Sequence, residues 1–244
     1  MHYTLYIIPF MSYIYTNFED YDMREFKTCI NPCYPGNSID VLPDAPFKYC
    51  NIMNTISKLN ITIDTLLEPG CAYCSLSACL CKKYNINNCY LFDYNNVSGH
   101  DINNTQQNIF DSNNINTKIL FKGGDFFKRI DEVPDNSIDV AIDGCSITHF
   151  GGKDGINCWN TAAKTLYTKL KKNGYMIISS DVKHSENIEE SYGAINDEFI
   201  YPNDIIKIFE QNDYQLCFTP IISNNLIEYQ SNPSLCVAHL CFKK

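Results

Sequence analysis

Acidic residues end several strand-like segments of this chain, and small-residue turns follow them. The run Thr65-Leu-Leu-Glu-Pro-Gly-Cys-Ala-Tyr-Cys74 is typical of a buried strand ending at Glu68, a turn through Gly70 and Ala72, and a helix beyond it. Small residues in a strand–turn–helix let backbone N–H groups approach a ligand closely. A carboxylate at such a turn repels a pyrophosphate but attracts an ammonium group or sugar hydroxyls. The turn therefore favours S-adenosylmethionine (SAM) over a dinucleotide.

Two further carboxylates follow later strand-like segments. Asp93 stands 23 residues after Gly70, close to the spacing of a ribose-binding carboxylate in nucleotide-binding folds. Asp125 follows a pair of glycines and precedes Phe126. It could contact a cofactor or cap a short helix that begins at Phe126, and the two roles are compatible.

A third group of polar residues lies near the ends of two later strands. His149 follows Asp143 by six residues in the same predicted loop. An imidazole near neutral pH can accept a proton, although a lone histidine is more often structural. Asp143 could orient a substrate, hydrogen-bond the cofactor's amino group, or share a divalent cation with Asp181 through oxygen ligands. We expect His149 as the first choice of base and Asp143 as the second catalytic group.

The elements that would position these residues alternate between strand and helix. Helices are expected at 47–59, 76–84, near 102–110, 159–170 and 202–211, and strands at 61–68, 89–93, 118–122, 138–143, 175–180, 214–222 and 235–242. This alternation indicates an α/β fold with a doubly wound, mostly parallel, seven-stranded sheet. Only about a dozen residues, without a helix, separate the last two strands. We therefore expect an antiparallel C-terminal hairpin at the sheet edge.

The order of these segments resembles the class I (Rossmann-like) SAM-dependent methyltransferases over about residues 55–244. The segments that carry the resemblance are Leu66–Cys74, Leu91–Asp93, Gly124–Phe126, Ile138–Phe150 and Leu170–Asp181. Of the three glycines in the family's first motif, only Gly70 is present, and Ala72 and Cys74 replace the others. This departure keeps open a non-catalytic relative that binds a partner.

The resemblance implies a methyl-transfer enzyme with SAM as its cofactor. The residues that it places around SAM are Glu68, Gly70, Ala72, Asp93, Asp125 and Phe126. Asp93 would bind the ribose, and Asp125 with its apolar neighbour would hold the adenine. Metal-dependent relatives usually carry a further Asp or Asn beside the second carboxylate, whereas Val182 follows Asp181 here. We therefore predict no metal.

Charge and composition narrow the acceptor and the compartment. The chain has 244 residues, a net charge of −9 and a pI of about 5.0, which argues against nucleic acid as a partner. No apolar run approaches the length of a membrane span. Thirteen scattered cysteines suit a reducing cytosol. The expectation is a cytoplasmic enzyme that methylates oxygen or nitrogen of a small polar acceptor, such as a sugar or nucleotide sugar.

The first 46 residues differ from the rest, being rich in aromatic residues and then in proline. They are too few to bury a core of their own, so we expect a lid over the substrate, followed by the methyltransferase domain at 47–244. The segment could also pack on a second copy of the chain, as in a homodimer. An NAD(P)-dependent oxidoreductase is a further alternative, which Gly70-x-Ala72-x-x-Ser75 matches poorly.

Overall fold

The computed structural model describes residues 13–24, 26, 44–72, 74–97, 99–151, 154–183, 199–224, 227–229 and 232–244. The helices are η1 (Phe18–Asp20), α3 (Ala45–Leu59), α4 (Leu76–Tyr84), α5 (Ile102–Ser112), α6 (Phe126–Arg129), η2 (Ile130–Glu132), α7 (Ile147–Phe150), α8 (Gly155–Lys169) and α9 (Pro202–Gln211). None of these helices has the length and apolar run that crossing a bilayer requires.

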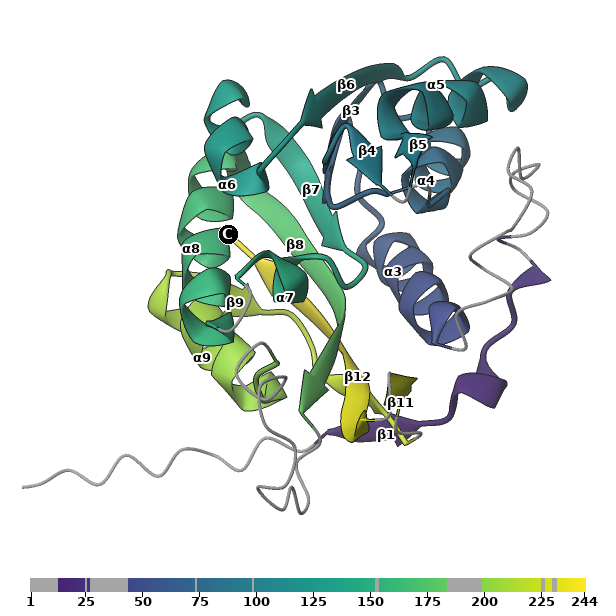
Figure 1. The fold of residues 1–244 in the computed structure, drawn as a ribbon. Coiled ribbons are helices and arrows are strands. Elements are labelled where there is room, and N and C mark those ends of the chain that lie inside the picture. The colour runs from purple at the N-terminus through teal and green to yellow at the C-terminus, as the bar shows by residue number, and fades with distance from the viewer. Residues whose placement is uncertain are drawn as a thin grey trace, which may run out of the picture.

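The strands form one large sheet and one small two-stranded sheet. They are β1 (Ile14–Thr16), β2 (Thr65–Pro69), β3 (Asn88–Asp93), β4 (Asn96–Val97), β5 (His100–Asp101), β6 (Lys118–Gly123), β7 (Ile138–Asp143), β8 (Leu170–Lys183), β9 (Gln215–Leu216), β10 (Ile221–Ser223), β11 (Ile227–Tyr229) and β12 (Asn232–Lys243). The large sheet has the order β1-β10-β12-β8-β7-β2-β3-β6, and β9 and β11 also pair with β12 (Figure 1).

The centre of the sheet is parallel and its C-terminal part is antiparallel. Strands β6, β3, β2, β7 and β8 pair in parallel, whereas β12 is antiparallel to both β8 and β10. This confirms the predicted doubly wound, mostly parallel sheet with an antiparallel C-terminal hairpin.

The edge of the sheet differs from the prediction. The hairpin's second strand, β12, lies between β8 and β10, and β1 from the N-terminal segment forms the outer edge by pairing with β10. The strand expected at 214–222 is split into β9 and β10. Pro220 lies in the gap, where proline has no N–H for the ladder, and its carbonyl accepts from the Ile14 N–H at 3.0 Å.

Side-chain caps explain two boundaries that differ from the expected ones. The strand expected at 61–68 begins only at Thr65, because Asp139 Oδ2 accepts the N–H groups of Asp64 and Thr65 at 3.0 and 2.9 Å. Helix α8 begins at Gly155 instead of residue 159, because the Asp154 side chain accepts from the Asn157 N–H and caps its first turn.

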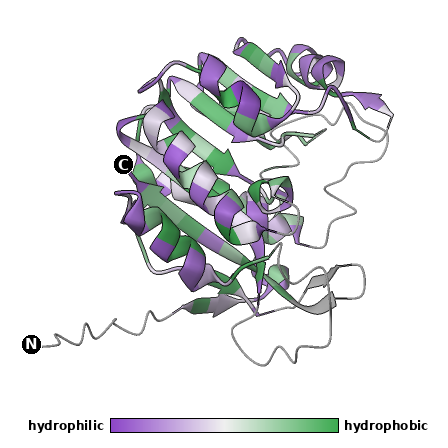
Figure 2. Cartoon of the chain, turned by 60° about the vertical axis from the view of Figure 1, so that its left-hand side comes forward, coloured by the Kyte–Doolittle hydropathy of each residue, from purple (hydrophilic) through white to green (hydrophobic). Residues whose placement is uncertain are grey.

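Helices cover both faces of the sheet. Helices α6, α8 and α9 pack on one face around Trp159 and Phe209, and α3, α4 and α5 pack on the other around Ile52 and Phe110. Figure 1 shows these two groups on opposite sides of the strands. In Figure 2 hydrophobic colour concentrates on the central strands, whereas the helices alternate between hydrophobic and hydrophilic residues. This alternation is the amphipathic pattern of helices that flank a sheet.

A histidine of β12 is buried in the apolar interior against α3. His239 is fully buried, its Nε2 lies 2.8 Å from Thr55 Oγ1, and its ring stacks on Phe218 at 5.7 Å. Burial lowers the pKa of His239 to about 3, because the imidazolium would lose its hydration, and nearby Lys58 acts in the same direction.

This buried histidine predicts a loss of stability in acid. Below about pH 6.5 the unfolded chain takes up a proton that folded His239 refuses, so the free energy of unfolding should fall by up to about 1.4 kcal/mol per pH unit until about pH 3. His239→Gln lacks this proton uptake. Urea titrations at pH 7 and 4.5 should therefore show wild type losing about 2 kcal/mol more than a cooperatively folding His239→Gln variant. Equal losses would contradict the prediction.

Candidate functional site

The turn after β2 lies directly against the loop after β7. Gly70 has a φ of +63°, and a Cβ on it would lie 2.2 Å from the Cβ of Ser146. The Ser146 hydroxyl donates to the carbonyl of Pro69 and to Asp143 Oδ1. The predicted motif glycine is therefore required both for its backbone conformation and for the close approach of this loop.

Glu68, the acidic residue of the motif, lies beneath the turn. Its side chain is buried and accepts from the Ser77 hydroxyl of α4 at 2.5 Å. Burial raises the pKa of Glu68 to about 8, and the nearby carboxylates of Asp143 and Asp93 add to the shift. Glu68 thus ties β2 to α4, and its contact with a cofactor stays a prediction.

Asp93 joins the end of β3 to the same turn. Its Oδ2 accepts from the Ala72 N–H at 2.6 Å, and its Oδ1 accepts from the Tyr94 N–H at 2.7 Å. Burial raises the pKa of this half-buried carboxyl. The structure therefore brings together two residues, Ala72 and Asp93, that the sequence placed around one ligand.

Gln106 supports the turn from α5, and sequence reasoning missed it. Its Nε2 donates to the carbonyls of Ala72 and Cys74 at 2.9 and 3.0 Å. Gln106 is fully buried beside Ile102, Ile109 and Phe110 on the inner face of α5. A glutamine on the apolar stripe of a helix was the feature that could have revealed it.

Phenylalanines form an aromatic wall at the end of the next strand. Asp125 accepts from the Phe127 N–H at 2.9 Å and caps α6, as the sequence predicted for one of its two roles. The buried ring of Phe126 stacks on Phe150 at 5.5 Å, and Phe127 meets Phe150 edge-on at 5.9 Å. Phe126, Phe127 and Phe150 are this wall, and Phe150 was not foreseen.

Asp143 holds the start of α7. Its Oδ1 accepts from the N–H groups of Ser146 and Ile147 at 2.8 and 3.1 Å. The carboxyl is fully buried, which raises its pKa, and its Oδ2 has no hydrogen-bond partner. Asp143 thus orients the loop that carries His149, and its catalytic role stays a prediction.

His149 meets Cys145 and Asp181 in a group that we call the loop cluster. Its Nε2 lies 3.9 Å from Cys145 Sγ, and the Asp181 N–H donates to that sulfur at 3.4 Å. One potential ligand atom from each of these three residues lies within 4.8 Å of the others. His149 is exposed, Cys145 half-buried and Asp181 buried. Asp143 does not belong to this group.

A buried lysine lies behind the loop cluster. Lys48 Nζ is 2.9 Å from Asp181 Oδ1 and forms a second ion pair with Asp44. Burial alone would lower the pKa of Lys48, but Cys145, Asp181 and Asp44 beside it raise the pKa well above its usual value. Neither Lys48 nor Cys145 was foreseen, although a lysine on the buried side of a predicted helix was a visible feature.

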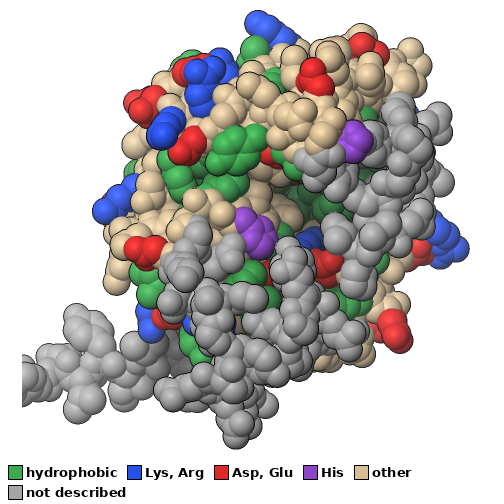
Figure 3. All heavy atoms as spheres, viewed as in Figure 1, with side chains coloured by type: hydrophobic (Ala, Val, Ile, Leu, Met, Phe, Trp, Pro, Cys, Tyr) green, Lys and Arg blue, Asp and Glu red, His purple; other side chains and the backbone are tan. Residues whose placement is uncertain are grey.

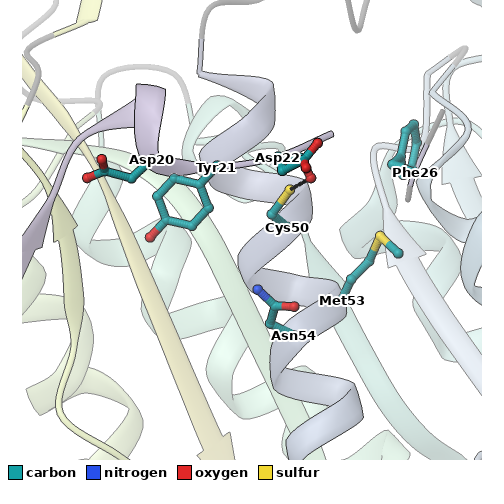
Figure 4. Close-up of a pocket in the computed structure, with 7 residues that line it drawn as sticks. All are labelled: Asp20, Tyr21, Asp22, Phe26, Cys50, Met53 and Asn54. Atoms are coloured by element: carbon teal, nitrogen blue, oxygen red, sulfur yellow. Dashed lines mark hydrogen bonds between the residues drawn. The ribbon is translucent and has the colours of Figure 1, made fainter. Parts of the chain in front are cut away.

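The described part of the N-terminal segment reaches toward this site along α3. Phe26 stacks on Tyr49 at 5.3 Å, and the Cys74 thiol donates to the Tyr49 hydroxyl at 2.8 Å. A pocket of about 290 Å³ between this segment and α3 contains none of the predicted site residues (Figure 4). It is lined by Asp20, Tyr21, Asp22, Phe26, Cys50, Met53 and Asn54.

The site lies where the parallel strands end. The Gly70–Ala72 turn and the loop with Cys145 and His149 follow β2 and β7, and Asp93 and Asp181 lie within the last three residues of β3 and β8. Figure 3 shows a hollow in this face of the molecule, with apolar side chains and charged side chains of both signs around it. Ligands of open α/β sheets bind at this edge of the sheet.

No family model and no curated protein matches the sequence, but solved structures match the fold. The cyclase SpnF aligns over 96% of this chain and 98% of its own, with 11% identity and a TM-score of 0.63. A SAM-dependent methyltransferase from Methanosarcina mazei aligns over 78% and 96%, with 12% identity and a TM-score of 0.59. The Burkholderia thailandensis 1,6-didemethyltoxoflavin-N1-methyltransferase, solved with bound S-adenosylhomocysteine, aligns over 80% of this chain and 76% of its own, with 10% identity and a TM-score of 0.53. This chain has the class I SAM-dependent methyltransferase fold.

The contact between the turn and the loop predicts how much stability the protein loses when Gly70 is replaced by alanine. Gly70→Ala should lower the free energy of unfolding by about 2–3 kcal/mol, from the left-handed backbone and from the collision with Ser146. Gly99→Ala is the matched control, since Gly99 also has a positive φ of +84° but nothing within 4 Å of its added Cβ. That variant should lose about 1 kcal/mol.

A double-mutant cycle separates the collision from the backbone strain. In a Ser146→Gly background, Gly70→Ala should cost about 1–2 kcal/mol less than in wild type, as measured by urea denaturation. An equal cost in both backgrounds would show that the two residues do not press on each other.

Proposed function

We propose that this chain is a SAM-dependent methyltransferase that acts on a small molecule. The observation that carries the proposal is the carboxylate of Asp93, held at the end of β3 beside the backbone of the Gly70–Ala72 turn. In a parallel α/β sheet this is the place for ribose hydroxyls. The methyltransferase fold, found across most of the chain, supports the same assignment.

The residues around the turn fit SAM. We assign the ribose to Asp93, the adenine to the aromatic wall beside Asp125, and the amino-acid part to the backbone around Gly70 and Ala72. Ser146 fills the space beside Gly70, so the fit to SAM rests on the carboxylate of Asp93 beside the backbone of Ala72. When bound, SAM supplies a methyl group activated by a positively charged sulfur.

The chemistry is an in-line displacement at the methyl carbon. The acceptor's oxygen or nitrogen forms a bond to that carbon as the carbon–sulfur bond breaks; the electron pair of that bond stays on sulfur, and the acceptor loses a proton. The protein's part is to position the two reactants and to assist the proton's departure.

The loop after β7 connects the cofactor side of the site with the loop cluster. Ser146 touches the cofactor turn, and its neighbour Cys145 lies in the loop cluster with His149. We assign the acceptor to this side. Two routes could remove its proton there: the imidazole of His149 as a base, or a metal ion that lowers the acceptor's pKa.

The acceptor that we favour is a small polar molecule, such as a sugar or nucleotide sugar, met in the cytoplasm. The net charge of −9 supports a partner other than nucleic acid. Among the similar structures are a mitomycin 7-O-methyltransferase and the toxoflavin-precursor N1-methyltransferase. The second candidate is a member of the fold that does not transfer methyl groups, because the cyclase SpnF shares the fold.

We also propose that the N-terminal segment covers the acceptor, either within one chain or between two copies. Residues 1–12, 25 and 27–43 of the expected lid lie outside the described residues. The contact chain from Phe26 through Tyr49 to Cys74 supports the proposal, because it joins the segment to the cofactor turn.

Asp93→Asn should weaken the binding of S-adenosylhomocysteine by about 10- to 100-fold, since a charged acceptor of ribose hydrogen bonds becomes neutral. Isothermal titration calorimetry of the full chain measures this loss. Asp213→Asn is the matched control: Asp213 is exposed beyond α9, and its φ of +64° suits asparagine equally. Unchanged affinity in the Asp93 variant would remove the main support for the proposed site.

Phe26→Ala should impair the acceptor half of the reaction selectively. Losing the stacked ring loosens the segment over Tyr49, so the KM for the acceptor should rise several-fold while S-adenosylhomocysteine affinity stays within about two-fold of wild type. Methyl-transfer kinetics measure the KM for the acceptor, and calorimetry measures the affinity for S-adenosylhomocysteine. Normal acceptor kinetics in a folded Phe26→Ala variant would refute the lid.

A further inference from the structure

We propose that Cys145, His149 and Asp181 bind a divalent zinc-type ion through three protein ligands. The cluster offers one thiol sulfur, one imidazole nitrogen and one carboxylate oxygen, all within 4.8 Å of one another. This mixed donor set suits Zn²⁺ better than Mg²⁺ or Ca²⁺, which take oxygen ligands. Three protein ligands leave a fourth position open, as in catalytic zinc sites.

The distance between the Cys145 sulfur and the His149 Nε2 is close to the separation of two ligands around one ion. With Zn–S near 2.3 Å and Zn–N near 2.0–2.1 Å, a tetrahedral ion separates sulfur and nitrogen by about 3.6 Å. Cys145 Sγ and His149 Nε2 lie 3.9 Å apart. The two side chains therefore need to move by only a few tenths of an ångström to share an ion.

The fold presents these three ligands from neighbouring strand ends. Cys145 has a φ of +90°, a conformation that costs energy for a residue with a Cβ and that is concentrated at functional sites. His149 follows four residues later in the short helix α7, and the loop turns so that its Nε2 lies 3.9 Å from the Cys145 sulfur. Asp181 belongs to β8, which pairs in parallel with β7.

The surroundings of the cluster resemble the supporting contacts of a metal site. The Asp181 N–H donates to Cys145 Sγ at 3.4 Å, which stabilises a thiolate. Lys48 lies 2.9 Å from Asp181 Oδ1 and holds that carboxylate in place, while the same oxygen is buried and receives no well-directed hydrogen bond. Such outer contacts orient metal ligands.

The buried charges also favour a cation. Lys48 faces two carboxylates, those of Asp44 and Asp181, so this group carries one more negative charge than positive. Binding a metal through a Cys145 thiolate adds one further negative charge and two positive ones, which leaves the whole group neutral. An isolated charge in a buried site is costly, so the ion balances the cluster.

This site differs from the metal pair that the sequence offered. Asp143 and Asp181 would have formed an oxygen-only site, but Asp143 is committed to the start of α7. The role of the metal site in catalysis rests on the proposed function. A zinc-type ion with an open position lowers the pKa of a hydroxyl or thiol bound to it. His149 would then act as a ligand and not as a base.

Cobalt spectroscopy of the full chain tests the site without any assay of activity. The protein, freed of metal by a chelator and kept reduced, is titrated with Co²⁺. We expect binding of one ion per chain, a near-ultraviolet band from thiolate-to-cobalt charge transfer, the intense visible bands of a four-coordinate ion, and displacement by Zn²⁺. Co²⁺ binding without the charge-transfer band would overturn the proposal.

Variants identify the ligands. Cys145→Ser should abolish the charge-transfer band. His149→Gln should weaken Zn²⁺ binding by more than about 100-fold, because removing a direct ligand costs more than the roughly 10- to 100-fold that losing a supporting contact costs. Cys217→Ser and His100→Gln are the controls, since both residues are exposed and outside the cluster, and both variants should match wild type. A band that persists in folded Cys145→Ser, or that disappears in Cys217→Ser, would overturn the site.

Calorimetry with S-adenosylhomocysteine on the same samples keeps the two proposals apart. Binding of S-adenosylhomocysteine without binding of Co²⁺ or Zn²⁺ would reject the metal site and leave the methyltransferase proposal standing. Binding of the metal at Cys145 and His149 without S-adenosylhomocysteine would support the metal site and reject the proposed cofactor.

Discussion

The close contact between Gly70 and Ser146 sets the geometry on which the rest of the site depends. Because Gly70 has no Cβ, the loop after β7 can lie against the turn after β2. Ser146 bridges the two by donating to the Pro69 carbonyl and to Asp143. One loop thereby carries both the contact to the Gly70–Ala72 turn and two side chains of the loop cluster, those of Cys145 and His149. A larger side chain at Gly70 would therefore displace the turn after β2 and the loop that carries Cys145 and His149 relative to each other.

Buried polar groups on either side of this contact fix its position. Asp93 accepts from the N–H of Ala72 and Gln106 donates to its carbonyl, and Asp143 holds the first turn of α7. Lys48 joins α3 to Asp181 at the end of β8. These bonds keep the turn and the loop cluster in place before a ligand arrives, and such preorganisation lowers the entropic cost of aligning two reactants.

Local patterns predicted much of the fold, and long-range partners explain what they missed. The bounds of α4, β7 and α9 agree with the expected ranges, because apolar periodicity and helix starts are local features. The addition of β1 depends on pairing with β10, about 200 residues away in the chain. The place of β12 depends on its pairing with β8, more than 50 residues earlier, and no local pattern contains either pairing. Asp125 as a helix cap was predictable for the same local reason.

The same division holds in the site. The sequence placed Gly70 in the turn after one strand and Asp93 at the end of the next, where the structure has them. His149 was expected in the loop after 138–143, and the structure puts it in the short helix α7 of that connection. Lys48 and Cys145 were missed because their importance lies in contacts with Asp181, which is far away in the chain. The carboxylates of Glu68 and Asp143 were expected to face a ligand, yet each also satisfies a buried structural partner. A carboxylate at a strand end indicates a ligand site nearby, but the packing around the side chain decides whether the carboxylate faces the ligand or a buried partner.

The most direct test of the proposed function is a calorimetric titration of the full-length protein with S-adenosylhomocysteine and, separately, with NAD⁺. The account predicts one molecule of S-adenosylhomocysteine bound per chain and no heat of binding from NAD⁺, because the Asp93 carboxylate stands beside the turn where a pyrophosphate would have to lie. Saturable binding of NAD⁺ with no binding of S-adenosylhomocysteine would contradict it.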